Sequence, residues 1–233
     1  PPSPPVRMPP FSPPSLAACA IGAAWLGFNL LLSRAAARSF GRAVVDGTPL
    51  WRSASGLGTS LLSLPLLFAA ALSSAGGIAA WSRRCAQLGL LTFDWAYFFV
   101  FGGLMLVDFA QGVLLTPLLR AHHAVCLCCH LFACLAALPA FPHYFAGVVA
   151  LELGSAATCA HALRPVAFPS AALLGVMSAS NLAAALCTLR WHAALREAQP
   201  IAAWGGASVS AVLMLARQRD ALQLHAARRR RSR

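Results

Sequence analysis

Long apolar runs, interrupted by arginines, prolines and glycines, make up most of this chain between Leu16 and Ala216. Only 10% of all residues are charged and 59% are hydrophobic. Soluble domains carry about 25% charged residues, so this chain has too few to cover a water-exposed surface. In lipid, each segment must satisfy its own backbone hydrogen bonds, which favours helices. The sequence therefore predicts an all-α fold, a polytopic transmembrane helical bundle of about six to seven spans.

Three regions follow from the same pattern. Residues 1–15 are rich in proline, and we expect them to be disordered. Residues 16–216 form the predicted membrane domain, and residues 217–233 a basic cytosolic tail. The predicted spans are residues 16–33, 53–81, 93–115, 121–138, 143–163, 170–189 and 201–216. The last is short for a span of about 20 residues. Since the chain begins with Pro1, we expect its natural N-terminus to lie further upstream.

The net charge of +12 comes from arginine alone, because the chain has no lysine. The arginines lie between apolar runs and in the tail, which is typical of topology signals facing anionic lipid rather than of nucleic-acid binding. With seven spans, thirteen of the 18 arginines fall on one side of the membrane. The positive-inside rule then places the C-terminus in the cytosol.

The adjacent pair His122-His123 lies within the apolar stretch of residues 93–165. Neighbouring residues on a helix point about 100° apart, so one imidazole can face a cavity while the other packs against a helix. Neutral imidazole is suited to act as a base or nucleophile near neutral pH. We take both histidines as catalytic candidates, with a hydrogen-bonded structural pair as the alternative.

Acidic residues accompany this pair. Asp108 and Glu152 are predicted inside spans, where a charged group must be protonated, paired or hydrated. An acid beside an imidazole orients it, so Asp108 joins the catalytic candidates. Interhelical clamps and a proton relay in a small transporter are the alternatives for these two acids. Asp94 is expected at the membrane interface, and His161 near the cytosolic end of its span. Glu152, His161 and Asp94 are supporting or cavity-lining candidates.

Eight cysteines are present, most of them within apolar runs, where cysteine behaves as a small hydrophobe. His122, Cys126 and His130 recur every four residues and so share one helical face. Such a face can bind a metal, but small apolar packing is the better interpretation because ligands with zinc-like spacing are missing from the sequence. We predict neither a metal nor a bound cofactor. Motifs of serine hydrolases, zinc proteases and P-loop proteins are also missing.

An aromatic-rich span containing Trp95, Gly102 and Asp108 precedes the histidine pair, and a later span carries the run Glu152-Leu153-Gly154-Ser155. His161 and an Arg-Pro terminus follow. Over roughly residues 50–216 this pattern resembles the TLC domain, which is shared by the translocating-chain-associating membrane protein and the ceramide synthases. The chain is most similar to the smaller TLC-domain-containing proteins.

The resemblance implies a helical bundle around a lipid-sized cavity, with membrane lipid or a fatty acyl chain as ligand. In the catalytic members the histidine pair serves acyl transfer, which implies acyl-CoA as co-substrate and roles for His122, His123 and Asp108. The alternative is a non-enzymatic regulator of membrane lipid composition or of ER–Golgi traffic. We expect an integral membrane protein of the endoplasmic reticulum, with the plasma membrane or another endomembrane as alternatives. The arginine-rich tail is expected to meet anionic lipid.

Overall fold

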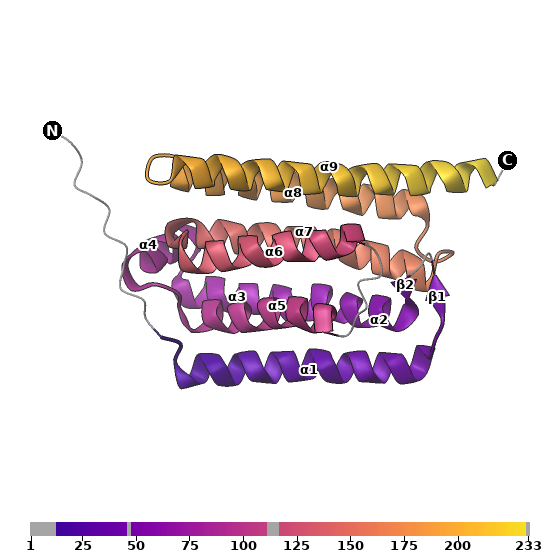
Figure 1. Ribbon diagram of the computed structural model, residues 1–233, viewed down its shortest axis with the longest axis horizontal. Helices are drawn as coiled ribbons and strands as arrows, with labels where there is room; N and C mark the ends of the chain where they lie inside the picture. Colours follow the sequence, from indigo (N-terminus) through magenta and orange to yellow (C-terminus); the bar gives the residue numbers. More distant parts are fainter. Residues whose placement is uncertain (1–12, 46–47, 111–116, 232–233) are drawn as a thin grey trace.

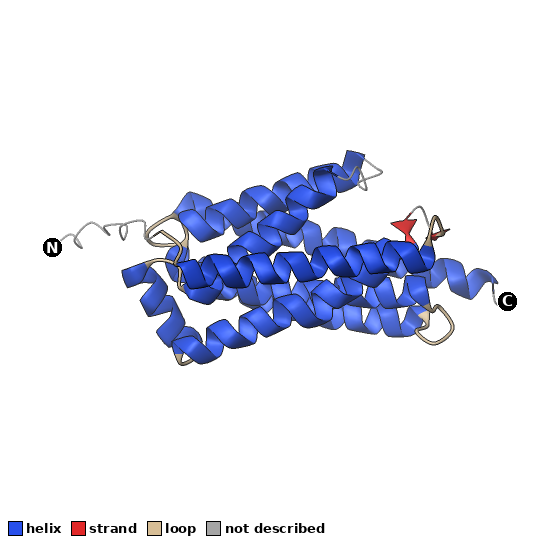
Figure 2. Cartoon of the chain, turned by 90° about the horizontal axis from the view of Figure 1, so that it is seen from below, coloured by secondary structure: helices blue, strands red, loops and turns tan. Residues whose placement is uncertain are grey.

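The computed structural model describes residues 13–45, 48–110 and 117–231. Apart from its turns and connecting loops, the described chain is helical, with one short antiparallel pair, β1 (Val44–Val45) and β2 (Thr48–Pro49), as Figure 2 shows. The predicted all-α fold is therefore confirmed. Most of the proline-rich segment expected at residues 1–15 lies outside the described residues. Its last residue, Ser15, caps the first helix by accepting a hydrogen bond from the backbone N–H of Ala18 at 3.1 Å.

The helices follow one another through short connections. In chain order they are α1 (Leu16–Phe40), α2 (Leu50–Gly58), the π-helical turn η1 (Thr59–Ser63), α3 (Leu64–Ala75), α4 (Ile78–Leu88), α5 (Thr92–Ala110), α6 (Pro117–Leu135), the 3₁₀ turn η2 (Leu138–Ala140), α7 (Phe141–Leu163), α8 (Ser170–Leu195) and α9 (Pro200–Arg231). Within the described residues, six helices are long and apolar enough to cross a membrane, and α6 carries a shorter apolar stretch, Arg120–Leu135. The chain is thus a helical membrane protein.

The helices run along one long axis and pack side by side (Figure 1). α1 lies at one edge against α5 and α2, and α8 with α9 lies at the opposite edge. α7 occupies the middle, where it packs on both α2 and α8. α1 starts and α9 finishes at opposite ends of the long axis. α7 therefore lies at the centre of the bundle, with other helices on both sides.

Several predicted spans end elsewhere than expected: α1 continues to Phe40 and α8 to Leu195, beyond the predicted ends at residues 33 and 189. The predicted span at residues 53–81 stops at Ala75, because Gly76 and Gly77 adopt φ of 79° and 100° and turn the chain into α4. The predicted span at residues 201–216 belongs to a much longer helix, since α9 continues to Arg231. The expected boundary between membrane domain and tail at residue 217 therefore falls inside one continuous helix.

The aromatic residues at the start of α5 belong to the main hydrophobic core. Tyr97 is fully buried and stacks on Phe145 with ring centroids 3.7 Å apart. Trp81 from α4 and Phe141 from α7 meet the same cluster through edge-to-face contacts. Aromatic pairs of this kind add about 0.5–1.5 kcal/mol beyond area burial. This cluster fixes the end of the bundle at which α4 meets α5 and α7.

Candidate functional site

A π-helical turn inside the second span positions part of the site. Pro65 has no N–H, and its ring clashes with the carbonyl four residues earlier, so the helix widens at η1 instead of continuing regularly. The widened turn places hydroxyl groups toward neighbouring helices. Thr59 donates to the Asn29 side chain at 2.6 Å, and Ser60 donates to Glu152 Oε2 of α7 at 2.7 Å. The carboxylate of Glu152 is thereby tied to the second span.

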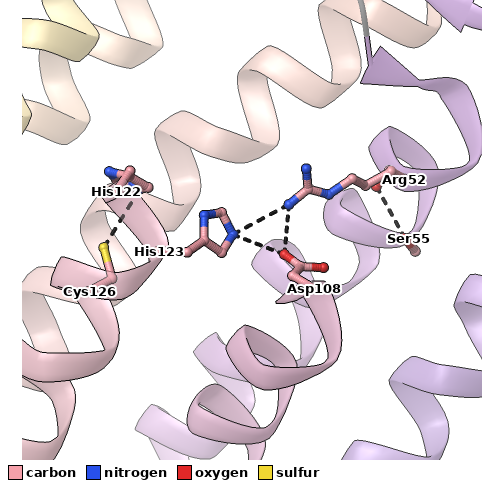
Figure 3. Close-up of polar contacts among 6 residues, drawn as sticks. All are labelled: Arg52, Ser55, Asp108, His122, His123 and Cys126. Atoms are coloured by element: carbon pink, nitrogen blue, oxygen red, sulfur yellow. Dashed lines mark hydrogen bonds and ion pairs between the residues drawn. The ribbon is translucent and has the colours of Figure 1, made fainter. Parts of the chain in front are cut away.

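Three helices meet at Asp108 (Figure 3). Arg52 of α2 donates from Nη2 to Asp108 Oδ2 of α5 at 2.6 Å, and His123 Nε2 of α6 lies 3.0 Å from the same oxygen. The side chains of Arg52 and Asp108 are 19% and 25% exposed, so water screens this pair only in part. The cluster therefore joins residues that are 71 positions apart in the chain.

The contacts indicate which ring nitrogen of His123 carries its proton. Nε2 lies 3.0 Å from the carboxylate and 3.4 Å from the Arg52 guanidinium. One nitrogen cannot donate to the first and accept from the second. The shorter contact to an ionised acceptor favours a protonated Nε2 that donates to Asp108. His123 is thus oriented by an acid, as a base–orienter pair requires.

His122 points in a different direction from its neighbour. In Figure 3 it turns away from Asp108, and its Nε2 lies 3.6 Å from the thiol of Cys126 one helical turn later. His130, two turns along, is fully buried and contacts the carbonyl of Phe98 at 3.1 Å and the hydroxyl of Tyr144 at 3.3 Å. In the described part of the chain no group of three or more His, Cys, Asp or Glu side chains could hold a metal ion. His130 is therefore a packing residue.

Two cavities lie inside the bundle. The larger, about 850 Å³, is called here the polar cavity. Charged and polar side chains in its wall include Arg52, Ser60, Asp108, His122, His123, Glu152, Ser155, His161, Arg217, Asp220 and Arg228. The smaller, about 380 Å³, is called the apolar cavity. Its wall includes Phe132, Tyr144, Val148, Leu213 and several cysteines. Both volumes fall in the range of about 300–1,000 Å³ found for ligand pockets.

The two cavities share part of their walls. Phe101, His122, Glu152 and Arg217 line both of them. Three of these four side chains are polar, so the boundary between the cavities carries a basic imidazole, an acid and a guanidinium. An elongated ligand that filled both cavities would place its central atoms beside these groups.

The structure separates the candidates that the sequence placed together. His122, His123, Asp108, Glu152 and His161 all line the polar cavity. Asp94 does not line either cavity. It is fully buried in the first turn of α5, where it accepts hydrogen bonds from Trp81 Nε1 at 3.1 Å and from the backbone N–H of Leu91 at 2.8 Å. Asp94 is therefore a helix cap and an interhelical link rather than a cavity residue.

Sequence reasoning missed Arg52, Ser60 and Arg217. Arg52 was interpreted as a topology signal and Arg217 as part of the tail. The spacing of Arg217, Ala221 and Leu224 at i, i+4 and i+7 marks one face of a continuing helix. This signal could have shown that Arg217 belongs to the bundle. Ala221 is indeed buried against Leu173 of α8.

Comparisons of the chain with models of protein families, with curated proteins and with solved structures find no match. Fold and cavities together define the class: a polytopic α-helical membrane protein with a polar cavity and an apolar cavity that share part of their walls. The two cavities and the side chains between them are the best candidates for a ligand site in this protein.

Proposed function

We propose that this protein handles lipid in the membrane by holding an acyl chain in the joined cavities and transferring it from acyl-CoA. The observation that carries the proposal is the shared wall. His122 and Glu152 border both the polar and the apolar cavity. An acyl chain in the apolar cavity would bring its thioester to these residues. The resemblance of the histidine pair and the Glu152 run to the TLC domain supports the same activity.

The two histidines would then have different roles. His123 donates to Asp108 within an ion pair with Arg52, which fixes the position of α6. His122 faces both cavities and would act as the base. An acceptor amine or hydroxyl attacks the thioester carbonyl, the new C–N or C–O bond forms and the C–S bond breaks. The acceptor proton passes through His122 to the sulfur of the departing CoA.

The charge distribution supports a cytosolic opening for the polar cavity. Asp220 and Arg228, both exposed, line this cavity near the C-terminal end of α9, where arginines are concentrated. The positive-inside rule would put this end, and the C-terminus, in the cytosol. A cytosolic opening suits acyl-CoA, and the arginines suit anionic lipid. The endoplasmic reticulum is the compartment we propose, as the site where the TLC-like pattern would act on lipid.

Acyl transfer can be tested with purified protein in nanodiscs incubated with a long-chain acyl-CoA and candidate acceptors. We expect the rate of CoA release to fall by about 10²–10⁴-fold in His122→Ala, the range for loss of a general base. His225→Ala is the matched control, because His225 lies outside both cavities and contacts Ser170 instead. Equal rates in the wild type and in His122→Ala would refute a base at this position.

A second candidate is a lipid-holding regulator without chemistry. The ion pair at Asp108 favours it, because a clamp between three helices needs no reactivity from His123. A native lipid that co-purifies with the wild type and with His122→Ala, together with no release of CoA, would support this candidate. If the protein instead acts in ER–Golgi traffic, deletion of residues 228–233 should change its location in cells, while the histidine variants should not.

A further inference from the structure

Arg217 is a cation in α9, one of the helices long and apolar enough to cross a membrane, and it forms no ion pair within the described residues. It lines both cavities. Glu152, which lines the same two cavities, acts on Arg217 electrostatically without forming an ion pair with it. Arg217 Nη2 donates to the carbonyl of Leu151 at 2.6 Å and its Nη1 to Ser155 Oγ at 3.2 Å. Across the described residues, no carboxylate lies within 4.0 Å of its nitrogens, whereas Arg52 has Asp108. Ionisable groups inside a membrane are costly and generally mark a functional site.

Hydrogen-bonding capacity is left over around the same point. Arg217 Nε is buried without a partner among the described residues. His161, only 5% exposed, donates from Nδ1 to the carbonyl of Phe168 at 2.7 Å and leaves Nε2 buried without a partner. A buried polar atom without a partner is unfavourable, and a ligand in the polar cavity that paired with it would remove this cost.

The backbone beside Arg217 is shaped to admit it. A Cβ atom at Gly154 would lie 2.6 Å from Arg217 Nη2 and would also collide with Ser180 Oγ. The missing side chain at position 154 therefore lets the guanidinium sit flat against α7. Its two contacts to α7 hold it there, so the cation faces the cavities in a defined orientation.

The apolar cavity supplies the other half of a ligand site. It begins at Arg217 and is lined by side chains of α6, α7, α8 and α9, among them Phe132, Val148, Ala184 and Leu213. A ligand with its polar end at Arg217 would have an apolar chain in this cavity. Hydrogen bonds to an ionised acceptor are about twice as strong as neutral ones, so an acidic end group suits Arg217 better than an ester or alcohol.

We propose that the joined cavities bind a single-chain anionic amphiphile, with its phosphate or carboxylate group on Arg217 and its alkyl chain in the apolar cavity. This proposal rests on the lipid-handling site described above and narrows the class of ligand. The two proposals differ in the chemical group that lies at the boundary between the cavities. Acyl-CoA would place an uncharged thioester there, whereas the amphiphile would place a charged phosphate or carboxylate there.

The test measures binding of hexadecyl phosphate, hexadecanoate and hexadecanol to the full chain in nanodiscs, with empty nanodiscs to subtract partition into lipid. We expect Arg217→Gln to weaken binding of the two anions by about tenfold or more, as loss of charged hydrogen bonds predicts. Arg219→Gln is the matched control, since it removes the same charge from an exposed position of α9 outside both cavities. Hexadecanol should bind weakly and respond to neither substitution.

Two results would overturn the anion site: unchanged anion affinity in Arg217→Gln, or hexadecanol binding as tightly as the anions. If Arg217→Gln fails to fold, Arg217→Lys keeps the charge without the planar fork and should weaken anion binding by a smaller factor. The wild-type protein alone also tests the proposal, because it should bind both anions more tightly than hexadecanol. Comparing the affinities for hexadecyl phosphate and hexadecanoate then shows which acidic end group the site prefers. Release of CoA, measured on the same samples, separates the two proposals, because either activity can fail while the other persists.

Discussion

Asp94 and Asp108 belong to the same helix, and their surroundings give them different roles. Asp94 is enclosed by Trp81, Cys85 and the backbone N–H of Leu91, in the manner of a capping box. Burial raises the pKa of the Cys85 thiol, so this group stays protonated and donates to Asp94. Asp108 instead lines the polar cavity and is paired with a cation. The environment, not the residue type, therefore decides between packing and site.

The ion pair between Arg52 and Asp108 should show energetic coupling. In a double-mutant cycle with Arg52→Gln and Asp108→Asn, each single change leaves one partially buried charge without its partner, and the double change leaves neither. We expect the double variant to lose less stability than the sum of the singles, with a coupling of about 0.5–3 kcal/mol. Reversible unfolding in detergent measures it. Arg190 lies near the C-terminal end of α8 and is not part of the Asp108 cluster. The stability changes of Arg190→Gln and Asp108→Asn should therefore add. Additivity in the Arg52 cycle would mean that the 2.6 Å contact contributes nothing.

Among the elements, the turn between α3 and α4 shows where a hydropathy pattern stops being informative. The apolar run continues through Gly76-Gly77 to Trp81, and hydropathy alone extends the span accordingly. The backbone turns there because Gly77 adopts φ 100° and ψ 165°, a region that residues with a Cβ avoid. α4 then packs across the end of the bundle.

Two glycine substitutions should change stability in opposite directions. Gly77→Ala should cost about 1–3 kcal/mol, because its backbone conformation strains any residue with a Cβ. Gly175→Ala, in the second turn of α8, should stabilise by roughly 0.5–1 kcal/mol through helix propensity. Neither added Cβ meets an atom within 4 Å, so only the backbone distinguishes them. Unfolding midpoints in detergent compare them directly. A stabilising Gly77→Ala would show that the turn is not held as described.

At the scale of the whole molecule, apolar side chains cover the outside and polar ones collect within. Leu182 and Leu186 of α8 and Val212 and Leu215 of α9 are all more than half exposed. His123, His161 and Asp94 are buried. A protein in water shows the reverse distribution. This arrangement is expected when lipid surrounds the helices and water reaches only the ends and the polar cavity.

Orientation in the membrane can be tested with an inserted N-glycosylation acceptor. An acceptor with flexible flanks at the Gly76–Gly77 turn should be modified, and one at Val166 should not, if the arginine-rich end lies in the cytosol as we propose from the positive-inside rule. Val166 is 94% exposed, so lack of access would not explain an unmodified site. The reverse pattern would invert the topology and remove the polar cavity from cytosolic acyl-CoA. A gel shift that is sensitive to glycosidase measures the outcome.

By itself the sequence determined the class of protein and most helix starts. Predicted spans beginning at Leu16 and Ser170 coincide with the first residues of α1 and α8. Runs of apolar residues can satisfy their backbone in lipid only as helices, so this part of the fold is local. Tertiary structure alone decided that Arg52 pairs with Asp108, that Asp94 is a buried cap and that Arg217 lies between two cavities. The reason is physical: the partners of a charge come from helices distant in sequence, and local pattern does not encode which of them it meets.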